Sequence, residues 1–223
     1  MIKLCIFDLD GTLVNSLCDL ADSMNYALKK HGFQPHETEK YKKMVGSGIS
    51  VLADRAMVIP AGSADSEMKK ALLADYNEYY HIHCMDKTRP YENIKELLDE
   101  LDKRNIMYSV MSNKPDNFSK RIVKTLFPEN QFASVWGKRD GFERKPSPQS
   151  VWALIDELGV KKEECLYIGD SDIDVLTAQN AGLKFCGVEW GFRSVEELRN
   201  TGAELIAETP FDILKVTDNE TNA

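Results

Sequence analysis

Nearly unbroken apolar runs recur along the chain, and stretches with helical periodicity separate them. The first run covers residues 2–7 (IKLCIF), and later runs cover 106–111, 132–137, 164–169, 184–188 and, more weakly, 203–207. Apolar strands without alternation are buried on both faces, and strands that alternate with helices form parallel sheets covered on both sides. The sequence therefore predicts an α/β fold: a doubly wound parallel sheet with a Rossmann-like core.

A block with helical periodicity alone interrupts this pattern after the first strand. Apolar spacing predicts helices over residues 16–31, 38–45, 49–58 and 64–82, and no strand candidate occurs between 16 and 85. A helical block of this size packs on itself as a small bundle. We therefore expect two domains: a Rossmann-like catalytic core of residues 1–15 and 86–223, and an inserted α-helical bundle of residues 16–85.

The charge and the cysteine content limit the partners and the location of the protein. With 28 Lys and Arg against 36 Asp and Glu, the net charge is −8, which disfavours a nucleic-acid partner. No apolar stretch approaches the roughly 20 residues of a membrane span, and no signal peptide precedes the first strand. The five cysteines form no Cys-x-x-Cys pair, which is typical of free thiols in the cytoplasm. We expect a cytoplasmic protein without a membrane partner; the sequence carries no signal for its oligomeric state.

Polar side chains follow each predicted core strand, where doubly wound sheets bind their ligands. Asp8, Asp10, Gly11 and Thr12 follow the first strand, and Ser112, Asn113 and Lys114 follow the second. Lys145 comes after the third strand and its loop, and the segment 170–174 (DSDID) follows the fourth. Each group alone could make a turn or cap a helix. Four such groups in this order indicate a functional site.

The carboxylates of this set predict a metal ion. Asp8, Asp10, Asp170 and Asp174 would repel one another in one crevice unless their pKa values rise or a cation neutralises them. Ligands that are all oxygens, with no histidine near the motifs, suit a hard ion. Few protein ligands, with room for water and phosphate, favour Mg²⁺.

The remaining polar residues predict a phosphate site. Ser112 and Asn113 precede Pro115, which is typical of a first helical turn whose free N–H groups bind anions. Gly11 and Thr12 add a close backbone approach and a hydroxyl, and Lys145 adds a fixed positive charge. These groups could hold the three equatorial oxygens of a phosphoryl group during transfer.

The aspartate doublet then has a chemical explanation. Asp8, held against Mg²⁺ and facing a phosphate, would attack phosphorus and form an aspartyl phosphate. Asp10 would protonate the leaving alcohol and then deprotonate the water that hydrolyses the intermediate.

Four ordered motifs carry a family resemblance. The stretches "DLDGTLVNS", "SNK", "KPSP" and "GDSDIDVLTAQNAG" resemble the signature motifs of the haloacid dehalogenase superfamily. The later stretch "VEWGFRSVEEL" resembles its phosphoglycolate-phosphatase-like branch. The resemblance covers the sheet domain, roughly residues 1–15 and 86–210, and covers the insert by its position and helical character.

The resemblance implies a role for each matched residue. It makes Asp8 the nucleophile and Asp10 the acid and base, with Asp8, the Asp10 carbonyl and Asp170 as ligands of Mg²⁺. It places Ser112 and Asn113 on the phosphate. Lys145 would hold Asp8 and the phosphate together, and Asp174 would orient waters or Lys145.

The resemblance also concerns the substrate. The helical insert is similar to a family cap that closes over the site and selects the substrate, so Gly46, Ser47 and Arg55 become candidate substrate contacts. A small phosphorylated metabolite is expected, with 2-phosphoglycolate as the first candidate. Gly169, where the mutase branch often has an acidic residue, favours a hydrolase. The alternatives are a pyrophosphatase, a nucleotide or sugar-phosphate phosphatase, a phosphomutase, and, outside this class, a phospho-aspartate switch or a non-catalytic binding module.

Overall fold

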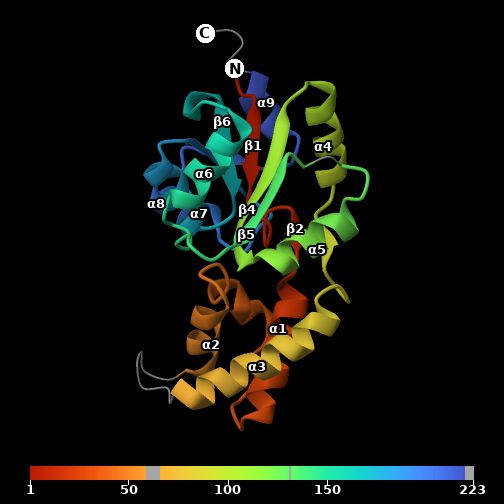
Figure 1. Cartoon of the computed structure of the whole chain (residues 1–223), viewed down its shortest axis with the longest axis vertical. Helices are drawn as coiled ribbons and strands as arrows, with labels where there is room; N and C mark the ends of the chain where they lie inside the picture. Colours follow the sequence, from red (N-terminus) through yellow and green to blue (C-terminus); the bar gives the residue numbers. More distant parts are fainter. Residues whose placement is uncertain (59–65, 131, 219–223) are drawn as a thin grey trace. The chain divides into compact units, whose positions relative to one another are not determined.

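The computed structural model describes residues 1–58, 66–130 and 132–218, and its contacts divide the chain into two units (Figure 1). The first unit comprises residues 1–14 and 90–223, and the second comprises residues 15–89. The first unit contains a parallel sheet, and the second is built from helices. No helix in the described ranges combines the length and the apolar content that crossing a bilayer requires.

The sheet of the first unit has six parallel strands in the order β5-β4-β1-β6-β7-β8. Their bounds are β1 Leu4–Phe7, β4 Met107–Pro115, β5 Ser134–Lys138, β6 Cys165–Gly169, β7 Lys184–Val188 and β8 Leu205–Ala207. From β1 the chain builds outward through β4 to β5, and then returns to β6 on the other side of β1. This reversal confirms the predicted doubly wound fold and places a ligand crevice at the carboxyl end of β1.

Helices cover both faces of the sheet (Figure 1), with α6 and α7 on one side and α4 and α5 on the other. Because successive side chains of β1 point to opposite faces of the sheet, this one strand packs against the helices on both sides. Leu4 and Ile6 share a core cluster with Leu154 of α6 and Ala178 of α7. The helical bounds are α4 Ile94–Lys103, α5 Asp116–Leu126, α6 Gln149–Leu158, the 3₁₀ helix η2 Lys162–Glu164, α7 Asp172–Ala181, α8 Val195–Thr201 and α9 Asp212–Asp218.

Strand β4 is longer than the sequence predicts. The expected strand ends at residue 111, but β4 continues to Pro115, with a shift of register against β5 between Met111 and Pro115. β4 extends beyond the end of β1, whose pairing with β4 ends at Val110. Beyond that point β4 pairs with β5, where Pro115 lies beside Lys138. The polar residues 112–114 therefore lie within the strand rather than after it, and α5 begins at Asp116, one residue beyond Pro115.

The second unit packs its helices around a core of its own. The elements are α1 Leu17–Lys30, the 3₁₀ helix η1 Thr38–Lys43, α2 Ile49–Met57 and α3 Ser66–His83. Buried side chains from each element fill this core, among them Met24, Tyr41, Leu52 and Leu72. The helix expected over residues 38–45 is thus a short 3₁₀ helix, and Gly46, with φ of 117°, follows it. Residues 64 and 65 of the helix expected over residues 64–82 lie outside the described residues.

The chain passes between the units at two short strands, β2 Val14–Asn15 and β3 Arg89–Pro90, which pair with each other. The sequence predicts the return to the core at residue 86, whereas residues 86–89 group with the helices. A buried carboxylate explains this difference. Asp19 of α1, only 2% exposed, accepts hydrogen bonds from the backbone N–H groups of Lys87 and Thr88 and from the Thr88 hydroxyl, and so ties this segment to α1.

Candidate active site

Asp8 lies directly beyond β1, at the crevice that the strand order creates. Its backbone N–H donates to the carbonyl of Ile168 on β6. This hydrogen bond continues the pairing of β1 with β6 and holds Asp8 beside the end of β6. Its Oδ1 lies 2.9 Å from Lys145 Nζ. Apart from this ion pair, Oδ1 has no hydrogen-bond partner among the described residues. Burial raises the pKa of Asp8 to about 7, although the Lys145 charge acts in the opposite direction.

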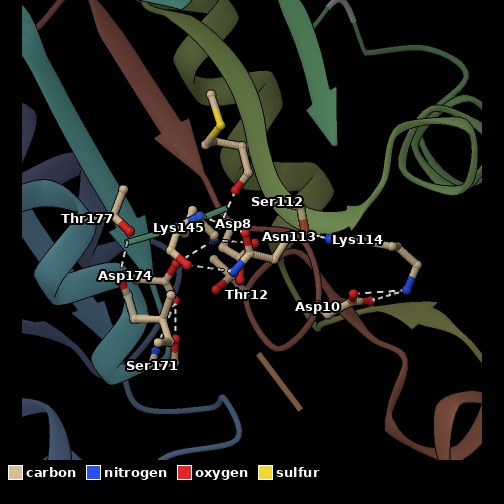
Figure 2. A network of polar contacts seen from close by, with 12 residues as sticks. Asp8, Asp10, Thr12, Ser112, Asn113, Lys114, Lys145, Ser171, Asp174 and Thr177 are labelled. Atoms are coloured by element: carbon tan, nitrogen blue, oxygen red, sulfur yellow. Dashed lines mark hydrogen bonds and ion pairs between the residues drawn. The ribbon is translucent and has the colours of Figure 1, made fainter. Parts of the chain in front are cut away.

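Lys145 is the cation of this cluster (Figure 2). Its Nζ donates to Asp174 Oδ1 at 2.6 Å and to the carbonyl of Met111 at 3.1 Å, beside Asp8. Burial opposes the charge of the ammonium, but Asp174 and Asp8 outweigh this cost and hold the pKa of Lys145 well above its usual range. Lys145 therefore remains a charged group between two buried carboxylates.

The Asn113 side chain holds the backbone of Lys145 in place. Its Oδ1 accepts from the Lys145 N–H at 2.8 Å, and its Nδ2 donates to the Lys145 carbonyl at 3.1 Å. The sequence predicts Asn113 as a phosphate ligand, and the structure brings it to the site together with Ser112 (Figure 2). Since both polar atoms of the Asn113 side chain contact Lys145, the first contribution of this residue is to position the lysine.

Asp170, directly after β6, lies in the same cluster as Asp8 and Asp174. Its Oδ1 accepts from the Thr12 hydroxyl at 3.1 Å, and its Oδ2 accepts from the backbone N–H of Phe192 at 2.8 Å. Burial and the charges of Asp174 and Asp8 raise the pKa of Asp170 well above its usual range. The predicted phosphate ligand Thr12 thus uses its hydroxyl to orient a carboxylate.

Glycines make this close packing of carboxylates possible. A Cβ on Gly11 would lie 2.3 Å from Asp170 Oδ2, and one on Gly191 would lie 2.1 Å from Asp170 Cβ. A Cβ on Gly169 would lie 2.4 Å from Asp174 Cβ. Real Cβ atoms do not approach other atoms so closely, so each of these positions requires glycine while the carboxylates keep their places.

Asp174, in the first turn of α7, completes the acidic group. Its Oδ2 accepts from the N–H and the hydroxyl of Ser171, at 3.1 and 2.6 Å, while Oδ1 accepts from Lys145. Asp8, Asp170 and Asp174 each offer an oxygen, and these atoms lie within 4.8 Å of one another. Two of these buried carboxylates, Asp8 and Asp174, share the Lys145 ammonium, and Asp170 has no ion pair with it among the contacts of the described residues. Such an all-oxygen, electron-rich donor set fits a hard divalent cation.

Asp10, the expected acid and base, is held by Lys114 on β4. In the sequence, Lys114 is only the last residue of the polar run that follows the second predicted strand. Lys114 Nζ donates to both Asp10 oxygens at 2.9 Å. Figure 2 shows this pair apart from the group formed by Asp8, Lys145 and Asp174. The predicted Mg²⁺ ligand of Asp10 is its backbone carbonyl. The ion pair of the Asp10 side chain does not involve this carbonyl, so the ligand role stays a prediction.

The segment just before Lys145, residues 139–144 (RDGFER), is rich in charged residues, and the structure shows the contacts of this segment. Arg139 stacks on Trp136, with its guanidinium carbon 3.9 Å from the ring centroid, and its Nε donates to Asp116 at 2.8 Å. Lys138 Nζ donates to the carbonyls of Arg139 and Phe142. These contacts shape the loop between β5 and Lys145.

The predicted substrate contacts of the insert all lie in the second unit. Arg55 Nη1 donates to the carbonyl of Met44 at 2.8 Å, and Nη2 donates to the Ser47 hydroxyl at 3.4 Å. Arg55 and Ser47 are therefore brought together, and Arg55 supports the loop that contains Gly46. A role of Gly46, Ser47 or Arg55 in substrate binding remains a prediction.

Comparison with known proteins supplies the family. The model of the haloacid dehalogenase-like hydrolase family matches residues 5–188. The chain belongs to the haloacid dehalogenase-like hydrolases. Phosphoglycolate phosphatase of Rhodospirillum rubrum is 34% identical over 207 residues, which cover 91% of this chain and 86% of that protein. N-acetylmuramic acid 6-phosphate phosphatase of Pseudomonas aeruginosa is 28% identical, over 97% of this hydrolase and 95% of its relative.

A solved structure agrees with these relatives. A candidate phosphoglycolate phosphatase from Lactobacillus delbrueckii subsp. bulgaricus superposes with a TM-score of 0.90 at 33% identity, over 96% of this hydrolase and 97% of that chain. The family, the relatives and the fold confirm that the chain is a phosphatase acting on phosphoric monoesters.

Proposed function

We propose that this hydrolase cleaves phosphomonoesters through an aspartyl phosphate on Asp8. The observation that carries the proposal is the buried Asp8 carboxylate, which lies 2.9 Å from the Lys145 ammonium while its Oδ1 has no hydrogen-bond partner in the described part of the chain. An oriented carboxylate oxygen beside a fixed cation is suited to attack phosphorus, because the cation offsets the charge of the incoming phosphate.

The proposed reaction has two steps in which Asp8 and Asp10 act in turn. An Asp8 oxygen forms a bond to phosphorus while the ester P–O bond breaks, and the leaving oxygen takes a proton from Asp10. Asp10 then accepts a proton from water as the water oxygen attacks phosphorus. The P–O bond to Asp8 breaks, which releases inorganic phosphate and restores the Asp8 carboxylate and the protonated Asp10.

The acidic cluster supports Mg²⁺ as the cofactor. Asp8, Asp170 and the Asp10 carbonyl would hold the ion, while Asp174 stays with Lys145 and Ser171, to which it already hydrogen-bonds. Bound there, Mg²⁺ would neutralise the carboxylates and the developing charge on the phosphoryl oxygens.

The phosphate cradle is proposed to consist of groups that surround Asp8. Lys145 supplies the positive charge, and Ser112 supplies a hydroxyl. Gly11 allows a close approach of the backbone, while Thr12 and Asn113 support the cradle by holding Asp170 and Lys145 with their side chains.

The substrate is proposed to be a small phosphorylated metabolite, with 2-phosphoglycolate as the first candidate and N-acetylmuramic acid 6-phosphate as the second. The relatives' names support both candidates. A cytoplasmic location is proposed as well, because the five cysteines carry no disulfide in the described part of the chain.

Replacement of the nucleophile tests the mechanism. Asp8→Asn should lower Mg²⁺-dependent phosphate release from an aryl phosphate by at least ~10³-fold, because an amide cannot form the acyl phosphate. Asp172→Asn, at the start of α7, is the control for loss of one negative charge: its side chain is 47% exposed and lies 3.7 Å from Arg193, outside the acidic cluster, so this variant should keep most of the activity. Wild-type turnover in Asp8→Asn would disprove the assignment. A labelled aspartyl adduct that persists without turnover would support a phospho-aspartate switch instead.

A further inference from the structure

The segment that follows β7, residues 189–193 (EWGFR), contacts the candidate active site at two points. The indole N–H of Trp190 donates to the carbonyl of Thr12 at 3.0 Å. Two residues later, the backbone N–H of Phe192 donates to Asp170 Oδ2 at 2.8 Å. One short segment therefore binds both the turn after β1 and the carboxylate after β6.

A third hydrogen bond joins these two points. The Thr12 hydroxyl donates to Asp170 Oδ1 at 3.1 Å, so each oxygen of this carboxylate has a donor of its own. The contacts form a closed ring that runs from Trp190 to Thr12, on to Asp170, and back to the same segment through Phe192. Thr12 and Asp170 are buried, with 0% and 1% exposure, so a donor lost from the ring would leave a buried acceptor unpaired.

Both ends of this segment are anchored. The Glu189 N–H donates to the carbonyl of Ala207 on β8 at 3.0 Å. At the other end, the Ser194 hydroxyl caps α8 by accepting from the Glu197 N–H at 3.3 Å. The residues between these anchors can therefore serve as a fixed support for the groups that they bind.

The turn after β1 receives one of its constraints from this support. The Leu9 carbonyl closes the turn by accepting from the N–H groups of residues 12–14 at 3.0–3.3 Å. The Thr12 carbonyl is bound from outside the turn, by Trp190, across 178 residues of chain. Because this carbonyl and the Thr12 hydroxyl belong to one residue, Trp190 also influences where the hydroxyl lies relative to Asp170.

We propose that Trp190 is a positioning residue for the Mg²⁺ site: its indole N–H fixes Thr12, and Thr12 fixes the orientation of the Asp170 carboxylate. The inference rests on the proposed function, in which Asp170 is a ligand of the ion. Groups that orient metal ligands change metal affinity by about 10–100-fold when they are removed. In this role Trp190 acts through Thr12 rather than by contact with the ion.

Replacement of tryptophan by phenylalanine tests this role, because it removes the N–H and keeps an aromatic ring. Calorimetric titration with Mg²⁺, without substrate, measures the affinity directly. Trp190→Phe should weaken Mg²⁺ binding by about tenfold or more. Trp152→Phe is the matched control, since the Trp152 indole N–H donates to the Ala181 carbonyl at 3.1 Å, outside the acidic cluster. Loss of that distant hydrogen bond should change the Mg²⁺ affinity by less than about twofold.

A double variant tests whether the effect passes through Thr12. Thr12→Val removes the hydroxyl and should also weaken Mg²⁺ binding by about tenfold. If both residues act on Asp170 through one link, adding Trp190→Phe to Thr12→Val should weaken the binding hardly further. Independent actions would multiply to about 100-fold, and this result would overturn the inference.

Thermal unfolding checks that each variant is folded. If Trp190→Phe is unstable, the wild-type ¹H–¹⁵N spectrum takes its place: Mg²⁺ should shift the indole resonance of Trp190 and leave that of Trp152 in position. Equal Mg²⁺ affinity in the wild type and Trp190→Phe, or a Trp190 resonance that does not respond to the ion, would overturn the inference and leave the proposed cofactor intact. A wild type that binds no Mg²⁺ would overturn the cofactor, and this inference with it.

Discussion

Lys145 places one buried ammonium beside two buried carboxylates, at 2.9 Å from Asp8 and 2.6 Å from Asp174. Asp170 adds a third carboxylate to the same group. One positive charge cannot balance three negative ones, and burial makes the imbalance expensive. Protons or a cation must therefore supply the missing positive charge, which is why single residues that pack against Asp170 matter for metal binding.

Gly191→Ala tests this packing at one residue. Its new Cβ would meet Asp170 Cβ at 2.1 Å, a rigid part of the side chain that cannot simply rotate away. We expect Asp170 to shift, with a loss of about 1–3 kcal/mol in the free energy of unfolding. The Mg²⁺ concentration for half-maximal phosphate release should rise by about tenfold or more, since a misplaced ligand weakens metal sites to this degree.

Gly141→Ala is the control for a glycine substitution as such. Gly141 has φ of 83° and no atom within 4 Å of an added Cβ, so alanine there costs only backbone strain, about 1 kcal/mol. Unfolding in denaturant and a Mg²⁺ titration of activity measure the two effects. If both variants left the Mg²⁺ requirement unchanged, the close approach at Asp170 would be irrelevant to the ion.

At the scale of elements, Asp19 joins helix α1 to the segment that leads into β3. Its carboxylate accepts from the Lys87 and Thr88 N–H groups and from the Thr88 hydroxyl, the last at 2.6 Å. These donors would otherwise be left unpaired close to the point where the chain leaves the helical unit. The polar contacts of one buried side chain therefore keep residues 87 and 88 with the helices.

Asp19→Ala should lower the free energy of unfolding by about 2–4 kcal/mol, because buried donors lose a charged acceptor. Asp22→Ala is a matched control on the same helix: Asp22 pairs with Lys87 Nζ at 2.7 Å, but the two side chains are 44% and 59% exposed. The exposed pair should contribute no more than about 1 kcal/mol. Equal losses for the two variants in urea unfolding would contradict the importance of burial.

On the scale of the whole molecule, distant parts of the sequence have to meet before the site exists. The Thr12 hydroxyl reaches Asp170 across 158 residues of chain, with the whole helical unit inserted between β1 and β4. The buried charges together destabilise the folded state. The stability of the protein should therefore depend on how these charges are neutralised.

Stability without divalent ions should fall as the pH rises from 5 to 8. Burial raises the pKa of Asp8 to about 7, and it raises that of Asp170 as well. Between the unfolded pKa, near 4, and the folded one, the folded state binds more protons than the unfolded state. Stability therefore decreases with rising pH across this window. Asp212, whose Lys215 partner lowers its pKa to about 2, loses its contribution only below this range.

Unfolding in denaturant with a chelator and with Mg²⁺, at pH 5 and pH 8, measures this dependence. Mg²⁺ should stabilise the protein more at pH 8, since protons compete with the ion for the same carboxylates. Asp8→Asn removes one of the titrating groups and should reduce the slope of stability against pH. A chelated wild type that is equally stable at both pH values would refute the expectation.

The local sequence was sufficient for the architecture and for grouping four of the polar residues at one edge of the sheet. Strands without alternation, separated by helices, specify a parallel sheet, and such a sheet brings the carboxyl ends of its strands to one edge. For this reason Asp8, Asp170, Asp174 and Lys145 could be grouped before any contact was known.

Only the tertiary structure decided how these residues share their partners. Lys114 lies 104 residues from Asp10, Asn113 holds Lys145 by its backbone, and Asp19 binds residues 68 and 69 positions away. The extension of β4 to Pro115 likewise depends on β5 beside it. Periodicity reports which face of an element is buried, but the partner of a buried polar group is set by the neighbour that folding brings within hydrogen-bond distance.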